Sequence, residues 1–205
     1  MSDDPYLIAG TETLRNTRAI TDAVDLARYE TRVSTARIVQ LVRGEVTILG
    51  CWDFQHLLDH HRHIFQDVYP WAGTARTTNL YKGATEFCRV TAIPEFAAQI
   101  FGELAEANHL QGMNRPKFVA GATHLLAEVN MLHPVREGNG RTQRAFLSSL
   151  ARQAGWHLDW TKADPAQNLA ASIAAYEGDE RPLAALLDDV VPRERSDWTE
   201  RAPNR

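Results

Sequence analysis

Residues 133–144 read HPVREGNGRTQR, and they join two segments that both have helical periodicity. Gly138 and Gly140 flank Asn139 close to the point where the second helix is expected to begin. Glycine tolerates a positive φ and lets a ligand approach the backbone closely. Free N–H groups at the start of a helix, helped by the helix dipole, form a ready site for an anion. The stretch therefore predicts an anion-binding loop between two helices.

Charged and titratable side chains surround this glycine pair. Arg141 and Arg144 lie three residues apart, so they share a helix face and can both reach a polyphosphate. Glu137 offers hard oxygen atoms, which suit a Mg²⁺ ion that bridges phosphates. His133, held by Pro134 after the preceding helix, can accept a proton near neutral pH. A base, a metal ligand, an anion site and two arginines together predict phosphoryl or nucleotidyl transfer.

Outward from this loop the chain has mostly helical periodicity. The first helix is predicted from Asp22 to Val42, with Thr21 as its N-cap and Gly44 as its stop. Proline at the start of four later segments favours further helices there. The predicted ranges of these other helices are 52–66, 94–108, 116–132, 141–154, 165–176 and 182–190.

Residues 73–90 have a different pattern, with threonines and aromatic residues on either side of Lys82 and Gly83. Such a pattern predicts a short two-stranded hairpin. The fold class is therefore predicted to be all-α, a helical bundle with one small β-hairpin.

The composition of the 205 residues is that of a globular protein, with 44% hydrophobic and 23% charged residues. Lys plus Arg number 22 against 26 Asp plus Glu, which argues against direct nucleic-acid binding. No apolar run is long enough for a membrane span, and the N-terminus has no signal-peptide pattern. We expect a cytoplasmic protein with one domain over 1–191 and a flexible, polar tail over 192–205.

The loop resembles the Fic (filamentation induced by cAMP) signature, HxFx(D/E)GNGRxxR, with Val135 where the family usually has Phe. We expect Val135 to alter local packing without removing a reacting group. A second run, Phe65 to Gly73 followed by Arg76 and Lys82, resembles the run lFgdvYxWAGxxR…K that family members carry upstream. The N-terminal segment also resembles that of bacterial Fic proteins, so the resemblance covers residues 6–190.

This resemblance implies a protein adenylyltransferase, which moves AMP from ATP to a Ser, Thr or Tyr hydroxyl of a target protein. His133 would be the general base that takes the hydroxyl proton. Glu137 would hold Mg²⁺ between the α- and β-phosphates. The backbones of Gly138 and Gly140, with Asn139, would surround the α-phosphate.

The resemblance also assigns the two arginines and the hairpin. Arg141 would neutralise the β- and γ-phosphates, and Arg144 would reach the γ-phosphate. The hairpin would be a flap over about residues 74–90 that registers a target segment by strand addition, with Thr78, Lys82 and Gly83 as candidate contacts.

Regulation is expected to come from outside the chain. Many Fic proteins carry an inhibitory helix with the motif [S/T]xxxE[G/N], whose glutamate pairs with the second arginine of the signature. The nearest match, Ser172 with Glu177-Gly178, has a spacing that is one residue too long. We therefore expect no inhibitory helix here, and a small antitoxin-like protein that docks near residues 22–42 and supplies a glutamate to Arg144.

Under this hypothesis the chain is the toxin of a toxin–antitoxin pair. Short bacterial relatives suggest a type II topoisomerase subunit, such as one of DNA gyrase, as the target. Three alternatives remain open. They are transfer of another group (phosphate, UMP or phosphocholine), a catalytically silent interaction module, and a helical DNA-binding protein.

A histidine cluster in the second predicted helix offers a rival site. His56 and His60 are spaced i, i+4, which can bind zinc, but the sequence suggests no third ligand. We expect these two residues, with His61 and His63, to be packing or solvated side chains.

Overall fold

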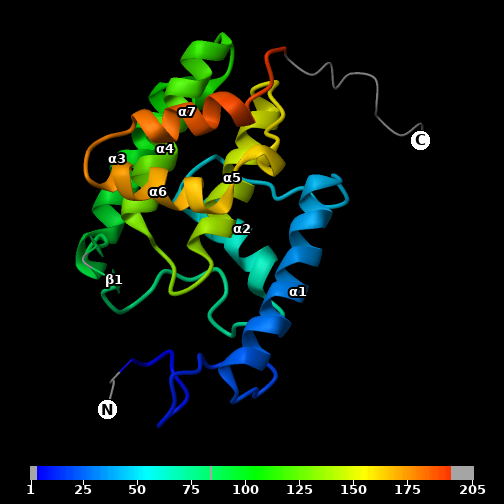
Figure 1. Ribbon diagram of the computed structural model, residues 1–205, viewed down its shortest axis with the longest axis vertical. Coiled ribbons are helices and arrows are strands. Elements are labelled where there is room, and N and C mark those ends of the chain that lie inside the picture. Colours follow the sequence, from blue (N-terminus) through cyan, green and yellow to red (C-terminus); the bar gives the residue numbers. More distant parts are fainter. Residues whose placement is uncertain (1–3, 84, 195–205) are drawn as a thin grey trace.

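The computed structural model describes residues 4–83 and 85–194. In these ranges the chain forms a helical bundle with one small antiparallel hairpin, which confirms the predicted fold class (Figure 1). The helices are α1 (Ala23–Val42), α2 (Phe54–Phe65), α3 (Ile93–Glu106), α4 (Arg115–Leu132), α5 (Asn139–Gln153), α6 (Pro165–Tyr176) and α7 (Arg181–Val190), with 3₁₀ turns η1 (Val90–Ala92), η2 (Asn108–Leu110) and η3 (Trp160–Lys162). The hairpin strands are β1 (Tyr81–Lys82) and β2 (Thr85–Glu86).

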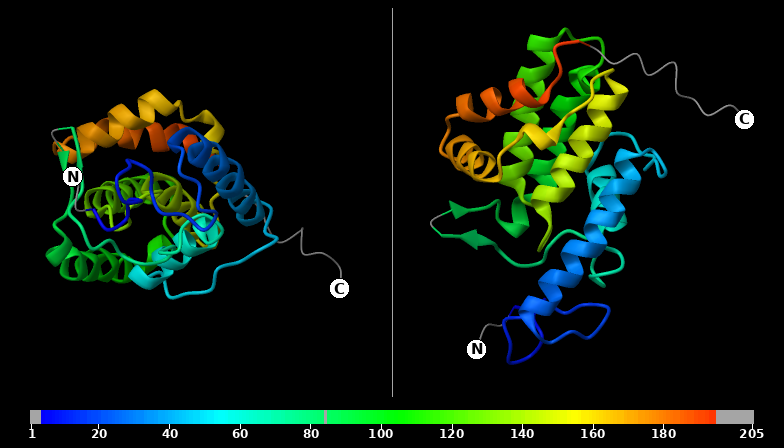
Figure 2. Two further views of the ribbon diagram at one scale, coloured as in Figure 1. Left: turned by 90° about the horizontal axis from the view of Figure 1, so that it is seen from below. Right: turned by 45° about the vertical axis from the view of Figure 1, so that its right-hand side comes forward.

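Helix α4 lies at the centre of the bundle, in contact with α3, α5, α6 and α7. Helices α1 and α2 pack on each other and on α5. One apolar cluster fills the space among α3, α4, α5 and α7, and a smaller one joins α1 to α2. The loop between α4 and α5 lies between the hairpin on one side and α1 on the other (Figures 1 and 2).

All the predicted helix starts except that of α6 are wrong by one or two residues, and in two cases the caps explain why. Helix α1 starts at Ala23 because the side chain of Asp22, not Thr21, accepts the N–H of Asp25 at 2.9 Å. Helix α5 starts at Asn139, two residues earlier than predicted, because Gly138 takes the left-handed conformation of its N-cap. The second shift places the glycine pair at the very start of the helix.

The hairpin is confirmed, although each strand has only two residues. Tyr81 pairs with Glu86, and Lys82 pairs with Thr85. The hydroxyl of Tyr176, at the end of α6, accepts the N–H of Glu86 at 3.2 Å and donates to its carbonyl oxygen at 3.0 Å. Helix α6 therefore holds the returning strand.

None of the helices in residues 4–83 and 85–194 is long and apolar enough to cross a membrane. Of the segment predicted to be a flexible tail, residues 195–205 lie outside the described residues.

Candidate active site

The loop geometry depends on Gly138. Its φ of +86° is in the left-handed region, and a Cβ built on it would lie 2.3 Å from ring atoms of Phe65. Phe65 is completely buried, so its ring has no room to retreat. The first i→i−4 bond of α5 runs from the Thr142 N–H to the Gly138 carbonyl, at 3.0 Å. The N–H groups of residues 139–141 precede that bond and have no i→i−4 partner, which is the arrangement expected of an anion-binding turn, whereas the predicted contribution of the Gly138 N–H is already taken by the Glu137 carboxylate.

Asn139 holds the loop in shape. Its side-chain amide donates to the carbonyl of Val135 at 2.7 Å, and its carbonyl oxygen accepts the Val135 N–H at 3.0 Å. Both polar groups of the side chain are therefore used inside the loop, and its backbone N–H belongs to the anion-binding turn. Val135 is 1% exposed, so it packs inward at the position where the signature usually has Phe.

Glu137 lies at the open edge of this turn. One carboxylate oxygen accepts the N–H of Gly138 at 2.8 Å and lies 3.5 Å from Nη2 of Arg141. The side chain is 43% exposed. Mg²⁺ is usually held by one or two carboxylates together with substrate phosphates and water. A single accessible carboxylate beside an anion site fits that pattern, and the described residues contain no group of three or more candidate metal ligands.

His133 follows the last residue of α4, with a left-handed φ of +44°. Its Nδ1 lies 3.1 Å from the carbonyl oxygen of Asn130, so Nδ1 carries the proton and Nε2 is the basic atom. The ring stacks on Phe87 at 3.7 Å between centroids. Burial, followed by the positive charges of Arg76 and Lys82, lowers the pKa of His133 to about 4. The imidazole is therefore neutral at pH 7 and able to accept a proton.

Residues of α1 hold the side chain of Arg141 in place. It donates to Oγ of Ser34 at 3.0 Å and to the carboxylate of Glu30, and its guanidinium carbon lies 4.7 Å from the centre of the Phe65 ring. Glu30 also accepts the hydroxyl of Tyr69. Sequence reasoning missed Glu30 and Ser34, although their i, i+4 spacing on the inner face of an amphipathic helix is a usable signal.

The side chain of Arg144 has neither a hydrogen bond nor an ion pair within the part of the chain that the structure describes. Its side chain is half-buried, and burial followed by the charge of Arg141 lowers its pKa. It lines a groove of about 370 Å³ between α1 and α5, together with Ile38, Val42 and Trp160. An unpaired, partly desolvated guanidinium is poised to bind an anion.

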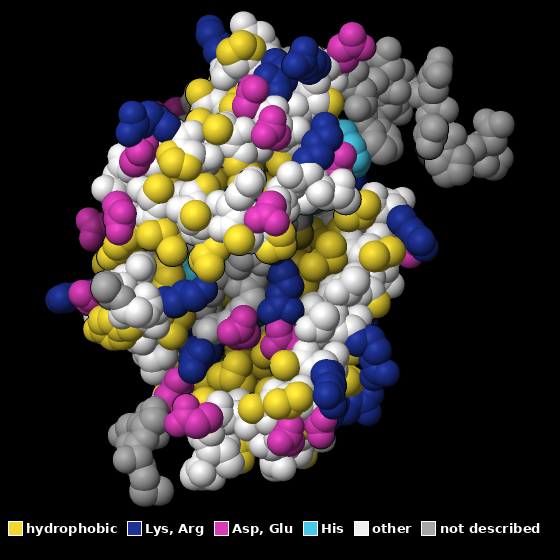
Figure 3. Space-filling model, in the orientation of Figure 1, with side chains coloured by type: hydrophobic (Ala, Val, Ile, Leu, Met, Phe, Trp, Pro, Cys, Tyr) yellow, Lys and Arg dark blue, Asp and Glu magenta, His cyan; other side chains and the backbone are white. Residues whose placement is uncertain are grey.

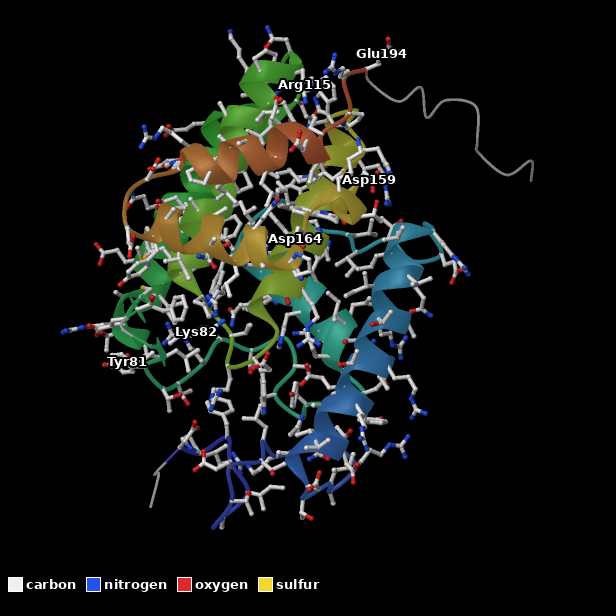
Figure 4. The ribbon with its side chains drawn as sticks, viewed as in Figure 1. Tyr81, Lys82, Arg115, Asp159, Asp164 and Glu194 are labelled. Atoms are coloured by element: carbon white, nitrogen blue, oxygen red, sulfur yellow. The ribbon has the colours of Figure 1, made fainter. Side chains whose placement is uncertain are left out.

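The flap residues differ in accessibility. Lys82 is exposed, and Gly83 has a φ of +60° that suits the turn. The hydroxyl of Thr78 is buried and has no hydrogen-bond partner among the described residues, so of the three candidate contacts only Lys82 and Gly83 are fully exposed. Figure 4 shows Tyr81 and Lys82 at the same edge of the molecule. Figure 3 shows positive and negative side chains together in a hollow beside the flap.

The histidines of α2 are packing residues, as predicted. His60 contacts the carbonyl of His56 at 2.9 Å and Oγ of Ser149 at 3.1 Å. His61 accepts the N–H of Gly73 at Nδ1, at 2.8 Å, and donates from Nε2 to the carbonyl of Glu137, at 3.1 Å. His61 thus holds the loop between α4 and α5 through a hydrogen bond, a role that helical spacing alone did not reveal.

The chain matches known proteins over most of its length. The model of the Fic/DOC family matches residues 51–151. The probable protein adenylyltransferase y4lH of Sinorhizobium fredii is 41% identical over 92% of this chain and 96% of its own length. This chain belongs to the Fic/DOC family. Residues 133–144 are therefore its Fic motif.

Two further relatives extend the comparison. Protein adenylyltransferase VbhT of Bartonella schoenbuchensis is 38% identical over 91% of this chain, which spans 38% of the length of VbhT. The crystal structure of the BepC protein of Bartonella tribocorum, which contains bound AMPPNP, has the same fold, with a TM-score of 0.86. It is 23% identical, and the match covers 93% of this chain and 97% of BepC.

Proposed function

We propose that this chain is a protein adenylyltransferase that moves AMP from ATP onto a Ser, Thr or Tyr hydroxyl of a target protein. The observation that carries the proposal is the arrangement of the Fic motif. A neutral histidine, the free N–H groups at the start of α5 and an arginine with an unpaired side chain lie within one loop and the first six residues of α5. The relatives of similar length are named as protein adenylyltransferases.

In this reaction the target hydroxyl attacks the α-phosphorus of ATP. Its proton passes to Nε2 of His133, the bond from the α-phosphorus to the bridging oxygen breaks, and pyrophosphate leaves. Because the carbonyl of Asn130 fixes the proton on Nδ1, Nε2 needs no change of tautomer. General-base help of this kind contributes about 10²–10⁴ to a rate.

Charge stabilisation comes from the rest of the motif. The N–H groups of residues 139–141 would bind the phosphate that carries the developing charge. Arg141 is already oriented by Glu30 and Ser34, so little side-chain entropy is lost when it contacts the polyphosphate. Arg144 would reach the terminal phosphate. Glu137 would hold Mg²⁺, which when bound neutralises charge on the phosphates.

AMP is favoured over other groups because the Gly138-Asn139-Gly140 turn is intact. Gly138 cannot carry a side chain without a clash, so the turn keeps its backbone N–H groups accessible. Transfer of phosphate or UMP is the alternative, and a silent interaction module would have no use for a neutral, oriented His133.

The target and its docking belong to the same proposal. Lys82 and Gly83 of the flap would pair with an extended target segment, next to the base. A type II topoisomerase subunit is the target class that short bacterial relatives suggest.

We also propose that a separate antitoxin-like protein inhibits the chain. Arg144 has no partner in the described residues, and the groove of about 370 Å³ beside it is lined by apolar residues of α1. A helix in that groove could place a glutamate on Arg144. The carboxylate that the chain itself supplies, Glu30, is bound to Arg141 instead. Co-expression with a neighbouring small open reading frame should then relieve toxicity, and harmlessness of the active chain alone would contradict this idea.

The decisive experiment treats a bacterial lysate with the protein, Mg²⁺ and ATP labelled in both the α-phosphate and the adenosine. Mass spectrometry should find the complete AMP group on a target protein, and the His133→Ala variant should give none. A phosphate group on the target that carries neither label would instead show transfer of the γ-phosphate and overturn the proposal.

A further inference from the structure

Arg76 is the most unusual buried residue of the molecule. It is 2% exposed and is among the largest fully buried side chains of the described residues. Its guanidinium donates only to backbone carbonyl oxygens: Nε to His133 at 2.8 Å, Nη1 to Thr78 at 2.7 Å, and Nη2 to Leu132 at 3.5 Å and to Cys88.

No carboxylate neutralises Arg76 among the residues that the structure describes. A buried charge without a counter-ion is normally very unfavourable. Here two of the acceptors, Leu132 and His133, are at the C-terminus of α4, where unpaired carbonyls and the helix dipole favour a cation. The end of α4 therefore takes the place of a carboxylate.

The four acceptors come from two parts of the site. Thr78 precedes the hairpin and Cys88 follows it, so Arg76 holds both legs of the flap. The other two acceptors belong to the catalytic histidine and to the residue before it. Two backbone bonds run in parallel, from the Arg76 N–H to Pro134 at 2.8 Å and from the Cys88 N–H to Met131 at 3.0 Å.

We infer that Arg76 is the positioning residue that fixes the flap relative to His133, so that a hydroxyl held on the flap meets Nε2. This inference rests on the proposed function for its catalytic consequence, but the anchor itself is a property of the fold. Lysine cannot replace arginine, because one ammonium group cannot reach acceptors on both legs of the flap and on α4.

The charge of Arg76 has a second effect. The groups that face His133 are Arg76, Lys82 of the flap, the ring of Phe87 and the carbonyl of Asn130. Loss of the guanidinium charge would therefore raise the pKa of His133, whereas Arg76→Lys keeps a positive charge nearby.

The test compares Arg76→Lys with Arg115→Lys as a matched control. Arg115 also donates to backbone carbonyls, those of Asp188, Val191 and Pro192, at the far end of the molecule from Lys82 (Figure 4). Unlike Arg76, it also pairs with the Asp188 carboxylate, at 2.5 Å. Both variants should lose thermal stability. Only Arg76→Lys should lower the rate of AMP transfer, on the order of 10²-fold for a misplacement of about 1 Å. Its affinity for AMPPNP, measured by calorimetry, should stay unchanged, because the phosphate-binding turn does not contact Arg76.

Two outcomes overturn the inference. One is a folded Arg76→Lys protein that transfers AMP at the wild-type rate. The other is loss of AMPPNP binding in step with loss of transfer, which would mean that the whole site collapses.

Hydrogen exchange of the unmodified protein decides the matter if Arg76→Lys does not fold. The amide hydrogens of Arg76, Cys88 and His133 should exchange with one common free energy of opening, because one anchor joins their segments. Independent opening of the flap would overturn the inference. If the unmodified protein transfers no AMP at all, the proposed function fails, while exchange still tests the anchor.

Discussion

Replacing Gly138 with alanine should destabilise the protein for two separate reasons. The left-handed φ of +86° costs a residue with a Cβ about 1–2 kcal/mol. The new Cβ would also lie 2.3 Å from the ring of Phe65, and such overpacking costs about 1–3 kcal/mol. Together these give about 2–5 kcal/mol. At about 2–4 °C per kcal/mol for a domain of this size, the melting temperature should fall by on the order of 10 °C.

Gly140→Ala is the matched control, two residues further along the same turn. Its Cβ would meet only the flexible end of Arg144, at 3.3 Å. Alanine inside a helix is also favoured over glycine by about 0.5–1 kcal/mol. In urea unfolding, the free energy of unfolding should therefore fall clearly more for Gly138→Ala than for Gly140→Ala. Equal losses would refute the argument.

A double-mutant cycle separates the two contributions of Gly138→Ala. Phe65→Leu replaces the ring that the new Cβ meets with a smaller side chain. In the double variant it should recover part of the lost stability, with a coupling energy of about 1 kcal/mol or more. Additive losses in the double variant would mean that backbone strain alone explains the effect.

Three further predictions concern neighbouring residues. Burial lowers the pKa of His60 to about 4. The contribution of the neutral imidazole to the free energy of unfolding is therefore complete above its unfolded pKa of about 6.5, and it is lost by about 1.4 kcal/mol per pH unit as the pH falls toward 4. Urea unfolding at pH 7.5 and 5.5 should show a smaller effect of pH on stability in His60→Gln than in the unmodified protein. Arg141→Ala leaves Glu30 without its cation, so it should lower the free energy of unfolding by about 3 kcal/mol and also lower nucleotide affinity. Arg144→Ala should weaken AMPPNP binding without changing the melting temperature. Equal melting temperatures for the two variants would contradict this. Asn139→Ala removes two buried hydrogen bonds and should cost about 2–3 kcal/mol in urea unfolding, and a loss below about 0.5 kcal/mol would show that the loop does not need this clamp.

Most helices were predictable because their signals are local. Helix α6 has the predicted bounds, since Asp164 caps it, Pro165 opens it and Gly178 follows it. The errors are also local in origin. Asp22 and Thr21 are both good caps, and only the backbone conformation selects Asp22.

The predicted site residues fall into two groups. His133, Glu137 and the anion-binding turn come together because they are neighbours in the chain. Arg144 differs from Arg141 in a way that spacing does not reveal, because the partners of Arg141 are more than 100 residues earlier in the chain.

The sequence by itself determined which groups the Fic motif brings together, because a histidine, a carboxylate, two glycines and two arginines within one loop and helix start need no distant contact to meet. Tertiary structure alone decided what holds them. Glu30 orients Arg141, His61 supports the loop under Glu137, and Arg76 joins the flap to His133. Each of these contacts joins segments far apart in the chain and depends on burial, which makes a hydrogen bond strong and an unpaired polar group costly.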